Sequence, residues 1–160
     1  MDNHAYEDAS FDWNEECKAT RKNGEYHSYD DKPAIIFDDG ELHWYQYGEL
    51  HRDNGPAVID ADGNKCWYKY GKKHRDNDLP AVIYAIGCME WWQNGKKHRD
   101  NDLPSVIYVN GRMEWRRNGK LHRDNNLPAV IEDGRAEWWV NGVKIKAGEY
   151  ISKVKSARNF

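Results

Sequence analysis

The sequence predicts an all-β protein built as a repeat array, and three observations lead to this fold class. One fourteen-residue phrase occurs twice with a single change, as GKKHRDNDLPAVIY at 71–84 and as GKKHRDNDLPSVIY at 95–108. Five histidines recur every 23 or 24 residues, and each of the five prolines follows one of them. Apolar residues come in short β-branched and aromatic runs that are bounded by glycine-containing turn pairs. Self-similarity at this period is typical of a stacked array.

The copies keep one register at several independent positions. The histidines are His27, His51, His74, His98 and His122, and the prolines are Pro33, Pro56, Pro80, Pro104 and Pro128. A tryptophan recurs at Trp44, Trp67, Trp91, Trp115 and Trp138. We therefore expect an elongated, single-layer antiparallel β-hairpin array of about five copies, each of 23–24 residues. Ten strands at about 4.8 Å each would extend over about 48 Å.

Each copy is predicted to form one hairpin. The first strand starts at the proline, as in PAVIY at 80–84, because proline is tolerated at the first position of a strand. The second strand is CMEWWQ at 88–93 or RMEWRR at 112–117, and the segment 94–103 leads to the next copy. Asp-Gly and Asn-Gly are the strongest signals for a two-residue hairpin turn, because both central residues need positive φ. The turn pairs are Asp39-Gly40, Asp62-Gly63, Asn110-Gly111 and Asp133-Gly134, with Ile86-Gly87 as the exception.

The predicted turn also assigns side chains to the two faces of the sheet. If Asn110-Gly111 is a two-residue turn, Val106 faces Trp115 across the hairpin, and Ile107 pairs with Glu114 on the other face. The recurring tryptophan and valine positions would then form the buried face. The other face would carry a series that differs between copies and consists of aromatic residues and arginine, which are typical of binding hot spots. This series, the variable row, is Tyr45, Tyr68, Trp92, Arg116 and Trp139. The alternative is that the row adds only packing.

The His-Arg-Asp phrase invites a catalytic or a metal-binding interpretation, and both are disfavoured. An active site needs one pocket, whereas five near-identical groups are spread along the array, and no Ser, Cys or Glu accompanies them at a fixed offset in every copy. Equivalent histidines would lie about 9.5 Å apart, whereas a shared zinc needs ligand nitrogens about 2 Å from the metal. We therefore predict no catalytic residue, no metal site and no cofactor.

Two interpretations of the phrase remain open. In the structural one, the phrase is the joint that stacks one copy on the next. Histidine would cap a strand end, arginine would pair with an aspartate of a neighbouring copy, and the phrase's own aspartate would form an Asx-turn. In the other interpretation, basic residues of the connections form a ridge that binds nucleic-acid phosphates or acidic lipid. The aspartate that follows each arginine cancels part of this positive charge. This alternative anion ridge consists of Lys72, Lys73, Arg75, Lys96, Lys97, Arg99, Lys120 and Arg123.

The two ends of the chain are expected to differ from the repeats. We predict an acidic N-terminal cap at 1–23, a five-copy repeat domain at 24–142 and a basic C-terminal cap at 143–160. Open ladders expose edges that invite association, so capping is the expected role of the two terminal segments. From Glu149 onward the spacing of Tyr150, Val154 and Ala157 predicts a short amphipathic helix. Head-to-tail self-association through the oppositely charged ends is the alternative.

Composition narrows the classes of function. Charged residues make up 32% of the chain, but eight tryptophans and ten tyrosines supply apolar area that disordered chains lack. The formal net charge of −3 disfavours a dedicated nucleic-acid binder. No apolar run reaches the roughly 18 residues of a membrane-spanning helix. The acidic start and three cysteines without CxxC spacing predict a cytoplasmic protein with reduced thiols, in the host cytoplasm if the protein is viral.

The order NGKxH, then a short aromatic or β-branched strand, a turn glycine and a strand ending in EW resembles the MORN repeat. The wording HRDxxPA followed by EWWxNGKxH is similar to MORN-variant repeats of bacterial antitoxin-like proteins and of phage and giant-virus proteins. The resemblance covers about residues 24–142, and it departs from the standard repeat where this chain has Arg-Asp and Pro in place of glycines. It implies a single-layer antiparallel β-ladder that binds a protein target without catalytic residues. An inhibitor or antitoxin-like factor from a phage, virus or bacterium is the expectation that follows.

Overall fold

The computed structural model describes residues 9–13, 17–147 and 149, and in this part of the chain it contains β-strands and no helix. The chain forms two compact units, unit 1 (Met1–His74) and unit 2 (Arg75–Phe160). Among the described residues there is accordingly no helix that is long and apolar enough to cross a membrane. Apart from Glu149 itself, the residues of the helix predicted from Glu149 onward lie outside the described part of the chain, so the helix stays a prediction.

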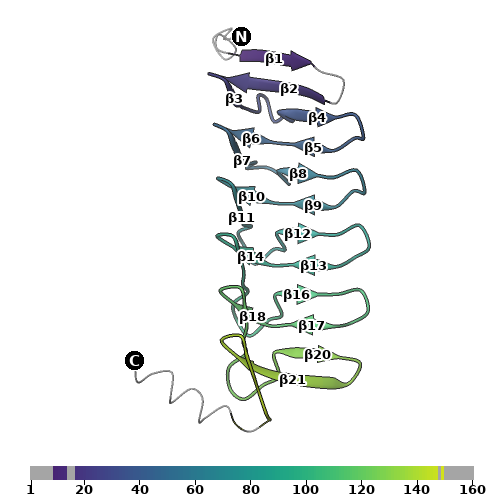
Figure 1. Ribbon diagram of the computed structural model, residues 1–160, viewed down its shortest axis with the longest axis vertical. Coiled ribbons are helices and arrows are strands. Elements are labelled where there is room, and N and C mark those ends of the chain that lie inside the picture. Colours follow the sequence, from purple (N-terminus) through teal and green to yellow (C-terminus); the bar gives the residue numbers. More distant parts are fainter. Residues whose placement is uncertain (1–8, 14–16, 148, 150–160) are drawn as a thin grey trace. The chain divides into compact units, whose positions relative to one another are not determined.

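Unit 1 contains an antiparallel sheet in the order β1-β2-β4-β5-β8-β9 (Figure 1). Its strands are β1 (Ala9–Trp13), β2 (Cys17–Lys22), β4 (Ile35–Phe37), β5 (Leu42–His43), β8 (Val58–Ile59) and β9 (Lys65–Cys66). The strand β3 (Glu25–Tyr26) pairs with β2. Two small hairpins lie outside this order, β6 (Tyr45–Gln46) with β7 (Glu49–Leu50) and β10 (Tyr68–Lys69) with β11 (Lys72–Lys73).

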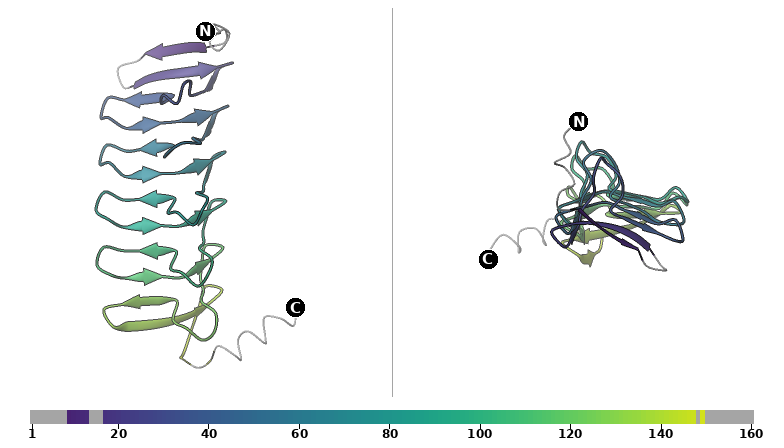
Figure 2. Two further views of the ribbon diagram at one scale, coloured as in Figure 1. Left: turned by 180° about the vertical axis from the view of Figure 1, so that it is seen from behind. Right: turned by 90° about the horizontal axis from the view of Figure 1, so that it is seen from above.

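Unit 2 repeats this plan in the order β12-β13-β16-β17-β20-β21-β22. Its strands are β12 (Val82–Ile83), β13 (Met89–Glu90), β16 (Val106–Ile107), β17 (Met113–Glu114), β20 (Val130–Glu132), β21 (Arg135–Val140) and β22 (Val143–Ile145). The small hairpins are β14 (Trp92–Gln93) with β15 (Lys96–Lys97) and β18 (Arg116–Arg117) with β19 (Lys120–Leu121). Within each unit the main hairpins follow one another in chain order (Figures 1 and 2). The prediction of an all-β antiparallel array of hairpins is confirmed.

Each of these copies holds two hairpins rather than the predicted one. The second hairpin is closed by Asn-Gly pairs such as Asn94-Gly95 and Asn118-Gly119. The φ angles are 50° at Asn94 and 79° at Gly95, and 50° at Asn118 and 86° at Gly119. Positive φ at both central residues is the geometry of a type I′ turn, which matches the twist of antiparallel strands. The segment predicted to lead simply to the next copy therefore begins with a second tight turn.

The main hairpins have a different turn from the one predicted. The amide of Tyr108 donates to the carbonyl of Arg112 at 2.9 Å, and the amide of Gly111 donates to the carbonyl of Tyr108 at 3.0 Å. Gly111 takes a φ of 84°, whereas Asn110 stays outside the left-handed region. This is a three-residue loop, with a type I turn followed by a left-handed glycine. Only the shorter copy has the predicted two-residue turn, at Asp133 (φ 45°) and Gly134 (φ 73°).

The longer loop shifts the pairing by one residue. Val106 pairs with Glu114 and Ile107 pairs with Met113, so Val106 and Glu114 share a face. The prediction that Val106 faces Trp115 and that Ile107 pairs with Glu114 is therefore wrong. A one-residue slip exchanges the faces of one strand relative to its partner, because side chains alternate along a strand.

The core is narrow and uses small residues where the chain enters each main hairpin. The residue after each proline is at most 1% exposed, and these residues are Ala34, Ala57, Ala81, Ser105 and Ala129. The tryptophans Trp44, Trp91 and Trp115 are buried, as are Val82, Val106 and Val130. The predicted burial of recurring tryptophans and valines is thus found in these copies, although the two sets lie on different faces.

Candidate functional site

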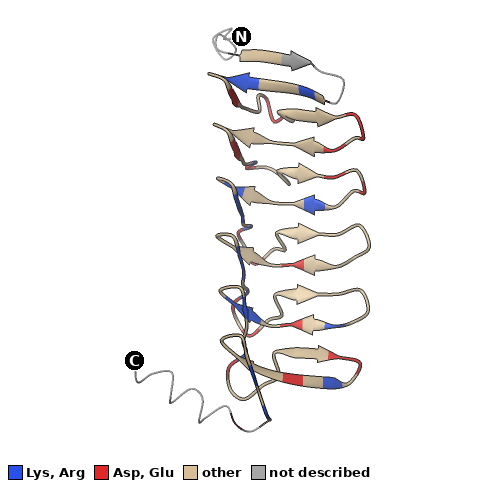
Figure 3. Cartoon of the chain, in the orientation of Figure 1, with Lys and Arg blue, Asp and Glu red and all other residues tan. Residues whose placement is uncertain are grey.

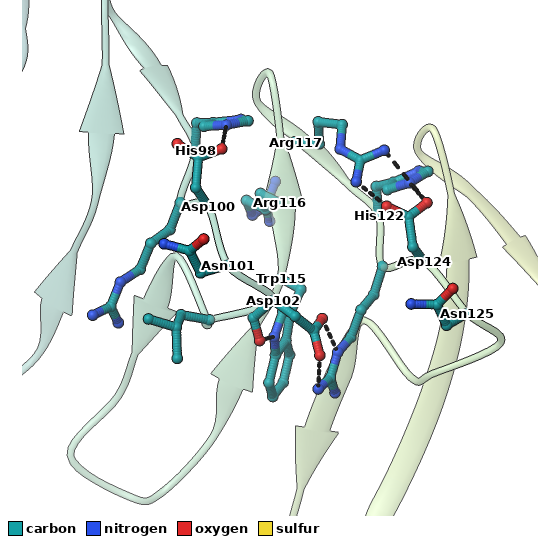
Figure 4. Close-up of a pocket in the computed structure, with 13 residues that line it drawn as sticks. His98, Asp100, Asn101, Asp102, Trp115, Arg116, Arg117, His122, Asp124 and Asn125 are labelled. Carbon is teal, nitrogen blue, oxygen red and sulfur yellow. Dashed lines mark hydrogen bonds and ion pairs between the residues drawn. The ribbon is translucent and has the colours of Figure 1, made fainter. Parts of the chain in front are cut away.

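The arginine of the repeated phrase joins successive copies in unit 2. Arg123 lies over the ring of Trp115, with 3.9 Å from Cζ to the ring centroid. Its Nε and Nη2 donate to the two carboxylate oxygens of Asp102 at 2.7 and 2.8 Å (Figure 4). Its Nη1 donates to the carbonyl of Pro128 at 3.2 Å. The indole Nε1 of Trp115 donates to the backbone carbonyl of the same Asp102 at 2.9 Å. A planar fork on a carboxylate combined with stacking on an aromatic ring is a role specific to arginine.

The same three-residue contact is present elsewhere in each unit. In unit 2, Arg99 binds Asp78 at 2.9 and 2.8 Å and lies 3.9 Å over Trp91. In unit 1, Nε and Nη2 of Arg52 each donate to a carboxylate oxygen of Asp31 at 2.8 Å, and its Cζ lies 3.9 Å from the ring centroid of Trp44. We call each such group of arginine, aspartate and tryptophan a joint. The predicted pairing of the arginine with an aspartate of a neighbouring copy is found. In unit 2 this aspartate is the third residue after the neighbouring copy's arginine, as Asp102 is after Arg99, and not the aspartate that directly follows that arginine.

The histidine of the phrase makes two hydrogen bonds that fix its tautomer. Nδ1 of His122 accepts from the backbone amide of Asn141 at 3.1 Å, and Nδ1 of His98 accepts from that of Asn118 at 3.2 Å. Nε2 therefore carries the proton and donates to the aspartate two residues on, Asp124 at 3.0 Å and Asp100 at 3.1 Å. Both ring nitrogens are occupied by structural bonds.

The backbone of the two residues after the His-Arg-Asp triplet explains why the phrase has Asn-Asp or Asn-Asn there. Asn101 and Asp102 have φ of 59° and 55°, and Asn125 and Asn126 have 59° and 57°. Two consecutive left-handed residues are unfavourable for most side chains, but asparagine and aspartate tolerate this region best after glycine.

An Asx-turn was predicted at the aspartate of the His-Arg-Asp triplet, but the carboxylate of Asp100 accepts from the side chains of His98 and Gln93. Asx bonds occur instead in the main hairpin turns, where Asp39, Asp60 and Asn110 accept from backbone amides two residues on.

Of the three members of the variable row in unit 2, Trp92 and Arg116 lie on the small-hairpin strands β14 and β18, and Trp139 lies on β21. Each is bonded to the glutamate two residues before it: Trp92 Nε1 to Glu90 at 2.8 Å, Arg116 Nε to Glu114 at 2.8 Å, and Trp139 Nε1 to Glu137 at 3.0 Å. The glutamates share their face with the paired valines of the neighbouring strands. All three row side chains are half-buried. In unit 2 each row residue thus contacts the glutamate with which it was predicted to share a face.

The central glutamate of this face carries a paired charge. Glu114 is buried at 2% exposure, and Arg112 and Arg116 each donate to its carboxylate at 2.8 Å. Burial alone would raise the pKa of Glu114, but the hydrogen bonds and positive charges of the two arginines outweigh it and hold this pKa below its usual value. Glu90 is similarly bound by Lys97 at 2.8 Å. The row in unit 2 therefore presents flat rings and a guanidinium with little unpaired charge beneath them.

In unit 1 the variable row consists of two half-buried tyrosines, Tyr45 and Tyr68. The ring of Tyr45 lies 5.3 Å from that of Tyr26 and 6.1 Å from that of His43, centroid to centroid. Burial is the main cause that raises the pKa of both row tyrosines above the usual value. Their hydroxyls are therefore neutral at physiological pH, and this part of the row is aromatic and uncharged.

The residues of the alternative anion ridge have diverse surroundings. The guanidiniums of Arg99 and Arg123 are bound in joints, and Lys97 is bound to Glu90. Arg75 donates to the carbonyl of Pro80 at 3.0 Å, and Lys73 lies 6.0 Å over the ring of Tyr68. Figure 3 shows basic residues on β11 and β18 and acidic residues in the turns after β4 and β8. The ridge members with exposed side chains are Lys72, Lys96 and Lys120, the first lysine of each connection.

A small polar pocket lies beside the joints of unit 2 and was not predicted from the sequence. It has a volume of about 150 Å³ and is lined by two successive phrases, with Asn101, Leu103, Trp115, Arg116 and Asn125 among its residues (Figure 4). Unit 1 has the equivalent pocket, of about 170 Å³, beside Trp44 and Arg52. Nothing in the sequence pattern signals a cavity, because it forms between segments about 24 residues apart. The part of the chain that the structure describes holds no cluster of three His, Cys, Asp or Glu that could ligate a metal.

Comparisons with known proteins leave the chain without an assigned family. No protein-family model matches the sequence, and no curated protein is significantly similar to it. The function is therefore inferred from the chemistry of the surface that the structure describes.

Proposed function

We propose that this chain is a non-catalytic repeat protein that binds a protein partner through its variable row. One observation carries the proposal: Trp92, Arg116 and Trp139 occupy the same place in three successive copies of unit 2, each bonded to a glutamate of its own copy. The joints use nearly the same residues in each copy, whereas the row varies. A repeat array can change its contact residues without changing its stacking, and a rigid sheet loses little entropy on binding.

The resemblance to MORN-variant repeats supports a more specific form of this proposal. Under it, the chain is a MORN-like inhibitor or antitoxin-like factor, encoded by a phage, virus or bacterium, that acts in the cytoplasm on a protein target. The proposal requires no cofactor. Aromatic residues and arginine dominate the energy of protein interfaces, because they bury large rigid surfaces at low entropic cost.

A second candidate is binding of nucleic acid or acidic lipid, which the exposed lysines Lys72, Lys96 and Lys120 favour. Phosphate binding releases counterions and weakens steeply as salt rises, whereas an aromatic interface changes modestly. The commitment of Arg99 and Arg123 to aspartates reduces the charge available to such a ligand. We therefore rank this candidate second.

The test is capture of ligands from host lysate by the tagged full chain at about 50 mM and about 500 mM salt, concentrations that separate the two mechanisms. We expect a protein retained at high salt and lost with the W92A/W139A variant. The matched control is K96E/K120E, which should spare that protein. Capture only of nucleic acid or lipid, lost at high salt and with the lysine variant, would replace the first candidate by the second.

A further inference from the structure

Two exposed tyrosines form the tips of small hairpins in unit 1. Tyr47 begins the tight turn between β6 and β7, and Tyr70 begins the one between β10 and β11 (Figure 1). Their φ angles are 50° and 47°, and the two residues are 62% and 55% exposed. We call Tyr47 and Tyr70 the tip tyrosines.

The turn itself does not require tyrosine. In unit 2 its first residue is asparagine, at Asn118 and Asn141, with φ of 50° and 51°. Asparagine tolerates the left-handed region, whereas a bulky side chain in this region is an outlier. Residues in strained conformations cluster at functional sites, and the exposure of the tip tyrosines shows that they do not fill the core. The tips in unit 1 therefore point to a contact surface.

Each ring is held in place by a histidine of the preceding copy. The ring centroid of Tyr47 lies 4.9 Å from that of His27, and the ring centroid of Tyr70 lies 4.3 Å from that of His51. Nδ1 of the same histidine accepts from the backbone amide of the tyrosine, at 3.3 and 3.2 Å. A ring that is already positioned loses little conformational entropy when a ligand binds.

A glutamate of the preceding hairpin lies against each tip. A Cβ atom added to Gly48 would lie 3.5 Å from Oε2 of Glu25, and one added to Gly71 would lie 3.8 Å from Oε1 of Glu49. Both glutamates are exposed. An aromatic face and a carboxylate both attract positive charge, so the two groups together favour a cation. In unit 2, where the tips carry asparagine, the place of the glutamate is taken by lysines, Lys96 and Lys120.

The first tip already contains a cation of the chain itself. Lys22 is paired with Glu25 in the register of β2 and β3, and its Nζ lies 6.0 Å from the ring centroid of Tyr47. At the second tip Gln46 is paired with Glu49 in the same way. The ammonium group at the first tip is thus replaced by an uncharged side chain at the second.

Two lysines of its own hairpin flank the second tip. Lys69 and Lys72 are paired on either side of the turn that Tyr70 begins, and both are exposed. Like charges repel, so these lysines disfavour a densely basic ligand at this tip. A ligand that offers one cation to Glu49 and the ring fits the local charge better.

We propose that Tyr70 and Glu49 bind a single lysine or arginine side chain of a protein partner, in the position that Lys22 takes beside Tyr47. Neither residue belongs to the variable row or to a joint, so this contact site is additional to the proposed function. The three residues at the site, including Gln46, all lie in unit 1.

The test is an NMR titration of the isotope-labelled full chain with a short glycine-serine peptide that carries one central arginine. We expect the backbone amides of Tyr70 and Gly71 to shift. The control peptide has citrulline, which has the shape of arginine without its charge, and should leave these amides unchanged. Equal effects of the two peptides, shifts confined to other residues, or no binding would each overturn the proposal.

Three substitutions taken from other copies of the chain separate the contributions. Q46K supplies a lysine as at Lys22 and leaves the ring and the carboxylate in place, so the arginine peptide should bind about threefold more weakly. E49K and Y70N introduce the residues found in unit 2, and each should weaken binding to a similar extent. Q46K changes only a surface side chain, and unaltered peptide binding by it would overturn the proposal even if Y70N does not fold.

A transplant to unit 2 tests whether the two groups are sufficient. K96E/N118Y places a glutamate and a tyrosine where Gln93 already faces residue 96. We expect a second site, seen as added shifts at residue 118 and Gly119, and their absence would contradict the proposal. W92A/W139A should bind the arginine peptide as the unchanged protein does, so failure at the tip and failure of the variable row are distinguishable.

Discussion

Arg123 shows at the scale of one residue why the repeated phrase is nearly invariant. Its side chain stacks on Trp115, binds both oxygens of Asp102 and reaches the carbonyl of Pro128. Lysine could supply the charge but neither the fork nor the flat surface. Where the array ends, Lys146 takes the place of this arginine, and Asn126 takes that of its aspartate. At this end of the array both members of the ion pair, the arginine and its aspartate, are therefore replaced.

The two adjacent tryptophans of one copy should differ in their effect on stability. Trp91 is 7% exposed and forms part of a joint, whereas Trp92 is half-buried in the variable row. We expect W91A to lower the free energy of unfolding by about 3–5 kcal/mol, the usual range for removing a buried aromatic side chain. W92A should cost clearly less. Urea denaturation of both variants measures this, and equal losses would contradict the assignment of Trp92 to a contact face.

Acid should destabilise the protein in two steps. Burial, and then the charge of Lys22, hold the pKa of His27 below its usual value of 6.5, so its contribution to stability is present above pH 6.5 and lost as the pH falls. Hydrogen bonds from joint arginines likewise lower the pKa of Asp31, Asp78 and Asp102, so their contribution is lost only as the pH falls below 3.8. Urea midpoints at pH 8, 5 and 3 should show both steps, and H27Q should remove only the first.

At the scale of the hairpin, the sequence predicts the existence of the strands but not the register of the main pair. Asn-Gly fits both a two-residue turn and the end of a three-residue loop, and only the number of residues between paired positions decides between them. That number places Val106 beside Glu114. The small hairpins were missed, although Asn94-Gly95 signals them, because two-residue strands are too short for a pattern of alternation.

The candidate site was predictable to a similar extent. The variable row and its glutamates could be placed on one face because each row residue follows its glutamate by two positions in the sequence. The break between β13 and β14, and between β17 and β18, was not predicted. The partners of Arg123 could not be predicted in full, because Asp102 is 21 residues away and two aspartates per copy compete for the same role. The pocket beside Leu103 forms where two successive connections pack together, and the spacing of the repeats in the sequence does not predict that packing.

The tip of one main hairpin offers a test of the turn itself. Ile86 is 70% exposed at the position where the next copy has Asn110, whose side chain accepts from the amide of Arg112 at 3.1 Å. We expect I86N to raise the melting temperature by a few degrees, since an added turn bond contributes up to about 1 kcal/mol. N110I should lower it by a similar amount. Opposite signs in thermal melting support the loop geometry, and equal signs contradict it.

At the scale of the whole molecule, a repeat array should tolerate removal of one complete copy. Deleting residues 95–118 joins Asn94 to Gly119, which restores the tight turn and brings Arg123 to Asp78 and Trp91 in place of Arg99. Each copy mainly contacts its neighbours, so we expect a shorter protein that still unfolds cooperatively. Deletion of residues 95–106, half a copy, is the control and should abolish cooperative unfolding. Loss of folding in both deletions would show that the copies are not interchangeable.

The central claim is that the joints hold the copies together while the variable row binds a partner. One experiment tests it: melting temperature and high-salt partner capture, measured together for R123Q, a joint variant, and W92A/W139A, a row variant. We expect R123Q to melt several degrees lower but to retain the partner below its melting temperature. We expect W92A/W139A to lose the partner while its melting temperature falls less. Row variants that retain the partner, or a folded R123Q that loses it, would contradict the account.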